Sequence, residues 1–157
     1  MDLSPDELAG VVDLFGALTR QDLREACVEL AHKVGADADP AEFDADIDRA
    51  VAGYQLVAVP EGDAESLVVG PTAFPELPDG ATDLPHILDA DERSVDRGRV
   101  ASAAERQFRD DAAGAVEAGD REAIERLLDV SYELDVWGPV ELSATRERLD
   151  SALEGSE

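Results

Sequence analysis

Lysine is almost missing from this chain of 157 residues: Lys33 is the only one, and the other twelve basic residues are arginines. Aromatic residues are also scarce, at 4% of the sequence. Cys27 is the single cysteine, which excludes an intrachain disulfide and favours a reducing compartment. The N-terminus lacks the basic-then-apolar pattern of a secretory signal, and apolar runs stay short of the roughly 18 residues of a membrane span. We therefore expect a soluble cytoplasmic protein that contacts no membrane.

Carboxylates dominate what is present. The chain has 38 acidic residues and a formal net charge of −25. Repulsion between so many carboxylates opposes compaction in dilute buffer, but the Debye length falls to about 3 Å in molar salt. A disordered acidic protein would share this charge. However, 44% of the chain is apolar and the apolar residues are periodic. The composition therefore favours a folded protein of the salt-rich cytoplasm of a halophilic archaeon.

Three segments near the N-terminus have the apolar spacing of amphipathic helices. The first begins at Ser4-Pro5 with a capping box, and the second and third begin at Thr19 and Asp39. Glycine ends each segment, at Gly16, Gly35 and Gly53.

After Gly53 the spacing of the apolar residues changes. Residues 54–59 and 67–69 are β-prone and are separated by the turn-rich residues 60–66, which predicts a hairpin. Residues 71–85 hold four of the eight prolines, and the pattern is compatible with either an ordered crossing or a linker.

The C-terminal part is helix-prone. One helix is expected from about Asp91 to Ala118, a second after the cap Asp120, and a last one from Ser143. Tyr132 and Trp137 are expected to anchor this core. The alanine-rich apolar face of the first of these helices is thin, which predicts packing against the N-terminal module or a second copy, as in a homodimer through the C-terminal helices.

The predicted fold is mainly α. A winged-helix-like module of three helices and a small β-hairpin occupies residues 1–70, a proline-rich connection 71–88, and a region of two or three helices 89–157.

Two resemblances support this organisation. The order of three helices and a hairpin over residues 5–70 resembles a winged helix-turn-helix domain. The strings Leu18-Thr19-Arg20, Glu29-Leu30-Ala31 with Lys33, Phe43-Asp44 and Gly53-Tyr54-Gln55-Leu56-Val57 are similar to a family of haloarchaeal hypothetical proteins without an assigned activity. The second resemblance therefore carries over no catalytic residue.

The winged-helix resemblance implies that the third helix would enter the DNA major groove. That helix holds four carboxylates against one arginine, Arg49, and the hairpin connection is acidic too. A DNA-binding surface needs donors to bases and phosphates in these places. Moreover, a site with six phosphate contacts loses roughly 10⁶- to 10⁷-fold in affinity between 0.15 M and 3 M salt. Conventional DNA binding is therefore disfavoured.

One segment concentrates positive charge. Residues 93–109 contain five arginines against two acidic residues, and the arginines are Arg93, Arg97, Arg99, Arg106 and Arg109. Arg93 and Arg97 are one turn apart, as are Arg106 and Arg109. Each pair can therefore share a helical face, as a contact surface for nucleic acid or an acidic protein. The alternative is pairing with carboxylates of the same chain, which is favoured because the chain has so many.

Other patterns predict no catalytic residue, metal site or cofactor. Asp44, Asp46 and Asp48 alternate as in a calcium loop, but Arg49 and Gln55 replace the required glycine and glutamate, so a solvated acidic face is expected. His32 and His86 do not form a zinc spacing with Cys27, which lies on an apolar stripe as a buried thiol.

The leading functional interpretation is a non-catalytic protein-interaction or regulatory module, with a protein as the expected partner. The second is a transcriptional regulator that contacts DNA through the arginine-rich helix. An enzyme ranks third, because no group of residues in the sequence has the spacing of a catalytic site. A deep pocket lined by convergent polar groups would favour an enzyme.

Overall fold

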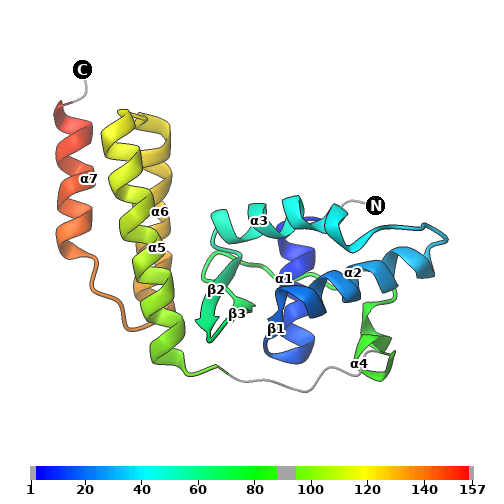
Figure 1. Cartoon of the computed structure of the whole chain (residues 1–157). Coiled ribbons are helices and arrows are strands. Elements are labelled where there is room, and N and C mark those ends of the chain that lie inside the picture. The colour runs from blue at the N-terminus through cyan, green and yellow to red at the C-terminus, as the bar shows by residue number, and fades with distance from the viewer. Residues whose placement is uncertain (1–2, 88–94, 156–157) are drawn as a thin grey trace. The chain divides into compact units, whose positions relative to one another are not determined.

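The computed structural model describes residues 3–87 and 95–155, and it is mainly helical (Figure 1). The chain divides into two compact units, Met1–Asp96 and Arg97–Glu157. The first unit contains helices α1 to α4 and a three-stranded sheet, and the second contains helices α5 to α7.

Helix α1 (Pro5–Phe15) begins with the predicted capping box. The Ser4 hydroxyl accepts from the Glu7 amide at 3.1 Å, and the Glu7 carboxylate accepts from the Ser4 amide at 3.1 Å. Pro5 occupies the first turn, where the missing amide hydrogen costs nothing. Gly16, with φ of 83°, ends the helix in a conformation that favours glycine.

The next two helices follow the sequence closely. Helix α2 (Arg20–Lys33) is capped by the Thr19 hydroxyl, which accepts from the Asp22 amide at 3.1 Å. Helix α3 (Asp44–Ala52) begins later than the sequence suggested, because the Asp39-Pro40 start forms a separate 3-10 helix, η1 (Pro40–Phe43).

The sheet contains one strand more than the predicted hairpin. Strands β2 (Leu56–Glu61) and β3 (Ala64–Val69) pair antiparallel, and β1 (Leu18–Thr19) pairs with the other side of β3, giving the order β1-β3-β2. The strands extend through most of the predicted connection, so that Gly62 and Asp63 alone form the turn. Pro60 is tolerated because β2 is an edge strand.

The core of the first unit joins these helices to the sheet. Its fully buried members come from α1, α2, α3, β1, β2 and β3 and include Leu8, Leu23, Ile47, Leu18, Leu56 and Leu67. The third helix and the hairpin are thereby fixed in one small body.

The proline-rich segment is an ordered crossing in residues 71–87. Its Thr72 hydroxyl donates to the Gly53 carbonyl at 2.7 Å, and two of its amides bind Asp6, as described below. Farther along, η2 (Ala81–Asp83) and α4 (Leu84–Ile87) bring Ala81 and Leu84 into the core. The first unit therefore extends beyond the expected 1–70 module.

The second unit is formed by α5 (Arg97–Ala118), α6 (Arg121–Trp137) and α7 (Ser143–Gly155). Helix α5 begins at Arg97 rather than near Asp91, since Val95 and Asp96 are not helical and 91–94 lie outside the described residues. Its alanine face is buried within the unit against α6 and α7, because small side chains allow close approach of helices. That face is therefore not open to a second copy, contrary to one expectation.

Candidate functional sites

The arginine-rich helix α5 has one exposed side that is predominantly basic. Arg99, Arg106 and Arg109 are exposed and follow one another at spacings of seven and three residues, with exposed Ser102 between the first two. Such spacings keep side chains on one side of a helix. Three of the five candidate arginines are therefore brought together.

The other two candidates are not part of this surface. Arg97 is two positions before Arg99, and its guanidinium donates to the Trp137 carbonyl oxygen of α6 at 2.8 Å. This hydrogen bond fastens the start of α5 to the end of α6. Arg93 lies outside the described residues.

Carboxylates of the second unit partly neutralise the basic side of α5. Arg109 pairs with Glu105 at 3.0 Å, one turn earlier. Hydrogen bonds from Ser143 lower the pKa of Glu141, and the nearby charges of Arg109 and Arg146 lower it further. By contrast, Arg106 forms no ion pair with any residue that the structure describes. On the basic side of α5, Arg109 is thus paired locally, whereas Arg106 is exposed to solvent.

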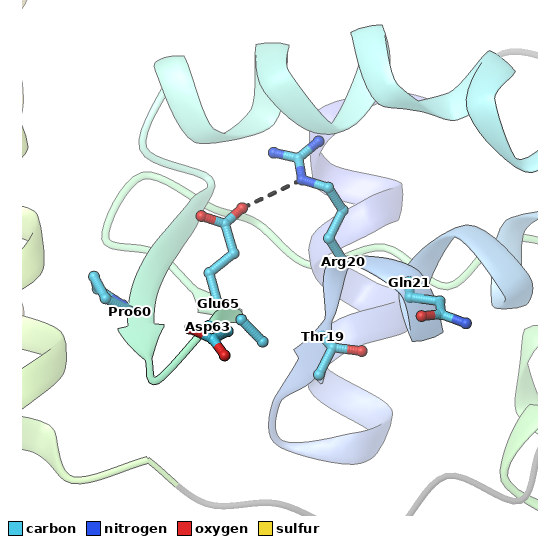
Figure 2. Close-up of a pocket in the computed structure, with 7 residues that line it drawn as sticks. Thr19, Arg20, Gln21, Pro60, Asp63 and Glu65 are labelled. Atoms are coloured by element: carbon cyan, nitrogen blue, oxygen red, sulfur yellow. Dashed lines mark hydrogen bonds and ion pairs between the residues drawn. The ribbon is translucent and has the colours of Figure 1, made fainter.

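A second candidate site lies between the start of α2 and the β2–β3 turn (Figure 2). The open pocket there is lined by Thr19, Arg20, Gln21, Pro60, Asp63, Ala64 and Glu65. Two of its three charged lining residues face one another: the Arg20 Nε lies 3.2 Å from the Glu65 Oε1. An ion pair within the chain therefore forms part of the pocket wall.

Arg20 is the centre of a larger ion-pair network, here called the Arg20 network, formed with Arg24, Asp44, Asp48 and Glu65. The Arg20 guanidinium also lies 2.9 Å from an Asp48 oxygen and 3.4 Å from an Asp44 oxygen. Arg24 donates to the same Asp44 oxygen at 2.7 Å. The network fastens α2 to both α3 and the hairpin.

The Arg20 network shifts the pKa of two of its members, Arg20 and Asp44. Partial burial lowers the pKa of Arg20, but hydrogen bonds and charge attraction from Glu65 and Asp48 outweigh it, so the net pKa is raised. The hydrogen bond from Arg24 is the largest cause that lowers the pKa of Asp44, and Arg20 adds to it. The pKa shifts of Arg20 and Asp44 therefore both favour the charged form of the group.

This arrangement corrects in part the expectation of a solvated acidic face on the third helix, where the Asp48 side chain remains 68% exposed. Asp44 and Asp48 bind arginines of α2, while Asp46 is buried, with 7% of its surface exposed, and pairs with Arg49 at 3.2 Å. The missed signal was a matched spacing: Arg20 and Arg24 are four residues apart, as are Asp44 and Asp48. Within residues 3–87 and 95–155, His, Cys, Asp and Glu side chains form no group that could hold a metal ion.

Cys27 is fully buried, as its apolar stripe predicted. Burial raises the pKa of its thiol to about 12, and the charge of Asp46 contributes to the shift. A thiol with such a pKa stays protonated near neutral pH and is a poor nucleophile.

The expectation that Tyr132 anchors the C-terminal core is wrong. Its side chain is 63% exposed, because the buried side of α6 carries Val130, Ser131 and Leu134 instead. The Arg146 guanidinium of α7 lies 4.8 Å from the centre of the Tyr132 ring and also binds Ser131 and Asp135. Tyr132 therefore takes part in a surface contact that joins α6 and α7. Trp137, the other expected anchor, is half-buried.

Comparison with known sequences decides the relationship of this chain. A family described as a family of unknown function, DUF7109, matches residues 6–154. The chain belongs to this family. The match spans both units and includes the Arg20 network and the arginines of α5. No curated protein and no solved structure gives a significant match. In the part of the chain that the structure describes, no helix is both long and apolar enough to cross a bilayer.

Proposed function

We propose that this protein is a non-catalytic protein-interaction module whose first unit is a scaffold of the winged-helix type. The element order α1-β1-α2-α3-β2-β3 supports this scaffold, since three helices precede a hairpin. The short β1 strand completes the sheet beside β3, with Leu18 opposite Leu67. In such scaffolds α3 is the helix offered to a partner.

The observation that carries the proposal is the engagement of the arginines around α3. Arg20, Arg24 and Arg49 each bind a carboxylate of this helix. Their guanidinium groups would have to leave those carboxylates before they could reach a phosphate. None of these three arginines is consequently available to bind a phosphate, which favours a protein partner over a nucleic acid.

A regulator that binds DNA through α5 is the second candidate. The specific observation in its favour is the exposed row of Arg99, Arg106 and Arg109. Arginines on one side of a helix can contact successive phosphates of a DNA backbone. This function would place the contact in the second unit and leave α3 without a role in binding DNA.

Charge and composition also support a proposal about the environment: the protein works in a salt-rich cytoplasm of the kind found in halophilic archaea. The net charge of −25 and the ratio of twelve arginines to one lysine are the supporting observations. Experiments on binding are therefore best made in molar KCl.

Co-purification of the tagged chain from a lysate in 2 M KCl tests the two functions directly. The bound species is scored as protein, DNA, RNA or nothing. The proposal expects a protein that remains after nuclease treatment, and recovery of nothing or of nucleic acid alone would overturn it.

A matched pair of variants tests the second candidate. The triple variant Arg99→Ser, Arg106→Ser and Arg109→Ser is compared with Arg121→Ser, Arg126→Ser and Arg148→Ser, which changes the net charge equally from exposed sites on α6 and α7. Fluorescence anisotropy with a labelled DNA duplex measures the affinity. If the α5 triple alone abolished binding, DNA recognition through α5 would replace the leading proposal.

A further inference from the structure

Among the described residues of the first unit, three large apolar side chains are exposed, and all three lie in or beside one loop. Phe74 is 77% exposed and Leu77 is 51% exposed, and both belong to residues 71–80, here called the apolar loop. Val34, which is 59% exposed, directly follows Lys33, whose ammonium binds the Gly80 carbonyl at 2.7 Å. In contrast, Phe15, Phe43 and Phe108 are at most 4% exposed.

The apolar loop is held in place by α1. The Phe74 amide donates to the Asp6 carboxylate at 3.0 Å, and the Glu76 amide donates to the Asp6 carbonyl at 3.0 Å. The backbone at Glu76 passes so close to Gly10 that a Cβ there would lie 2.0 Å from the Glu76 carbonyl oxygen. Pro75 and Pro78 restrict the backbone further. Phe74 and Leu77 are therefore presented by a preorganised segment, which reduces the entropy lost on binding.

The charge around the apolar loop is negative. The loop contains Glu76 and Asp79 and no basic residue, and Asp83 follows it. The only lysine of the chain, Lys33, is already bound to the Gly80 carbonyl and lies 3.8 Å from an Asp83 oxygen. Exposed apolar residues bordered by acidic ones match an apolar pocket bordered by basic ones.

We infer that the apolar loop is the docking segment of this module, and that its occupant is a protein with an apolar pocket bordered by arginine or lysine. This inference rests on the proposed protein-interaction function, adds the apolar loop to α3 as a contact surface and specifies the partner's chemistry. A second copy of this chain is a poor occupant through the same loop, because Glu76 and Asp79 would give it the same negative border. Contacts made by apolar groups also survive in concentrated salt, which screens charge pairs.

Site-specific photo-crosslinking tests where the partner docks. A benzophenone side chain is introduced in place of Phe74, and in a matched control in place of Val136, which is 91% exposed on α6. After irradiation in a lysate with 2 M KCl, we expect position 74 to capture one protein that position 136 does not. The captured peptide should contain apolar residues flanked by arginine or lysine.

Binding of the captured protein, once identified and purified, completes the test. We expect Phe74→Ser and Leu77→Ser each to weaken its affinity at least about tenfold, the usual size for a central apolar anchor, and Val136→Ser to have no effect. Circular dichroism and thermal unfolding check that each variant is folded. An equal affinity for wild type and both loop variants would overturn the inference.

The remaining outcomes separate the inference from the function on which it rests. Crosslinking of position 74 to a second copy of the chain, or to nothing, overturns the inference alone if co-purification still recovers a protein. Failure of co-purification to recover any protein overturns both.

Discussion

The Asp44 carboxylate makes the stability of the Arg20 network depend on pH. Its pKa lies below the ordinary value of 3.8 because Arg24 and Arg20 favour the charged form. A carboxylate with a lowered pKa in the folded state stabilises the fold above its unfolded pKa. That contribution is lost as the pH falls through the folded pKa.

We therefore expect Asp44→Asn to lower the free energy of unfolding by about 0.5–1 kcal/mol near neutral pH, the scale of partly exposed ion pairs. The difference from wild type should shrink as the pH falls below about 4. Chemical denaturation at several pH values in 2 M KCl measures it. Asp37→Asn, at an exposed site in the loop after α2, is the matched control. A deficit that grew toward acid pH would contradict this assignment.

Cys27 gives a second expectation at the residue scale. Because the thiol is fully buried and its pKa is about 12, a thiol reagent should react with the folded protein only as fast as the first unit opens. The labelling rate, followed by absorbance with an aromatic disulfide, should rise to that of a free thiol in denaturant. Rapid labelling under native conditions would show that Cys27 is accessible.

Among the elements, α1 and the apolar loop depend on each other at Gly10. An alanine Cβ would lie 2.0 Å from the Glu76 carbonyl oxygen, so the loop or the helix must move. We expect Gly10→Ala to destabilise the first unit by about 1–3 kcal/mol, the usual range for overpacking, although alanine is the better helix former.

Gly114→Ala is the matched control, since Gly114 lies within α5 and no atom outside the helix's own backbone lies within 4 Å of the added Cβ. This variant should stabilise the second unit by about 0.5–1 kcal/mol. Thermal unfolding by circular dichroism measures both variants. Two changes of the same sign would show that helix propensity, and not the contact with Glu76, decides the effect at Gly10.

The elements also show how far local patterns determine this fold. Caps such as Ser4 and Thr19 act within one helical turn, so the starts of α1 and α2 were predictable. Strand β1 has only two residues, and its Leu18 pairs with Leu67, which is distant in the sequence. Local sequence patterns therefore could not predict this strand. The proline-rich segment was equally ambiguous, because its order comes from tertiary partners such as Asp6.

The candidate sites show the same division. The sequence identified the arginines of α5 and predicted that Arg106 and Arg109 share a helical face, but the exposed position of Arg99 on the same side comes from the structure. It did not identify the apolar loop, because the exposure of Phe74 depends on how the loop crosses α1. Burial and ion pairing between elements are properties of the folded chain.

For the whole molecule, the two units share the charge unequally. Residues 1–96 contain 23 acidic and five basic residues, a net charge of −18, whereas residues 97–157 contain 15 acidic and eight basic residues, a net charge of −7. Since salt screens repulsion between carboxylates, raising KCl from 0.1 M to 2 M should stabilise the first unit more than the second.

Scanning calorimetry at both salt concentrations checks this expectation, and the intrinsic fluorescence of Trp137 assigns the transition of the second unit. Sodium sulfate and KCl at equal ionic strength distinguish screening from a general salting-out effect. If salt stabilised the second unit more than the first, the net charge of a unit would not determine how its stability depends on salt.

The close passage of the chain over Gly10 also constrains how this family can diverge. Positions 10 and 76 are far apart along the sequence, yet the backbone of one leaves no room for a side chain on the other. A relative that acquires a larger residue at the first position must shorten, lengthen or reroute the segment around the second. Gly10 and the segment around Glu76 are thus expected to change together among relatives. A relative without the glycine should also present the residue at position 74 differently.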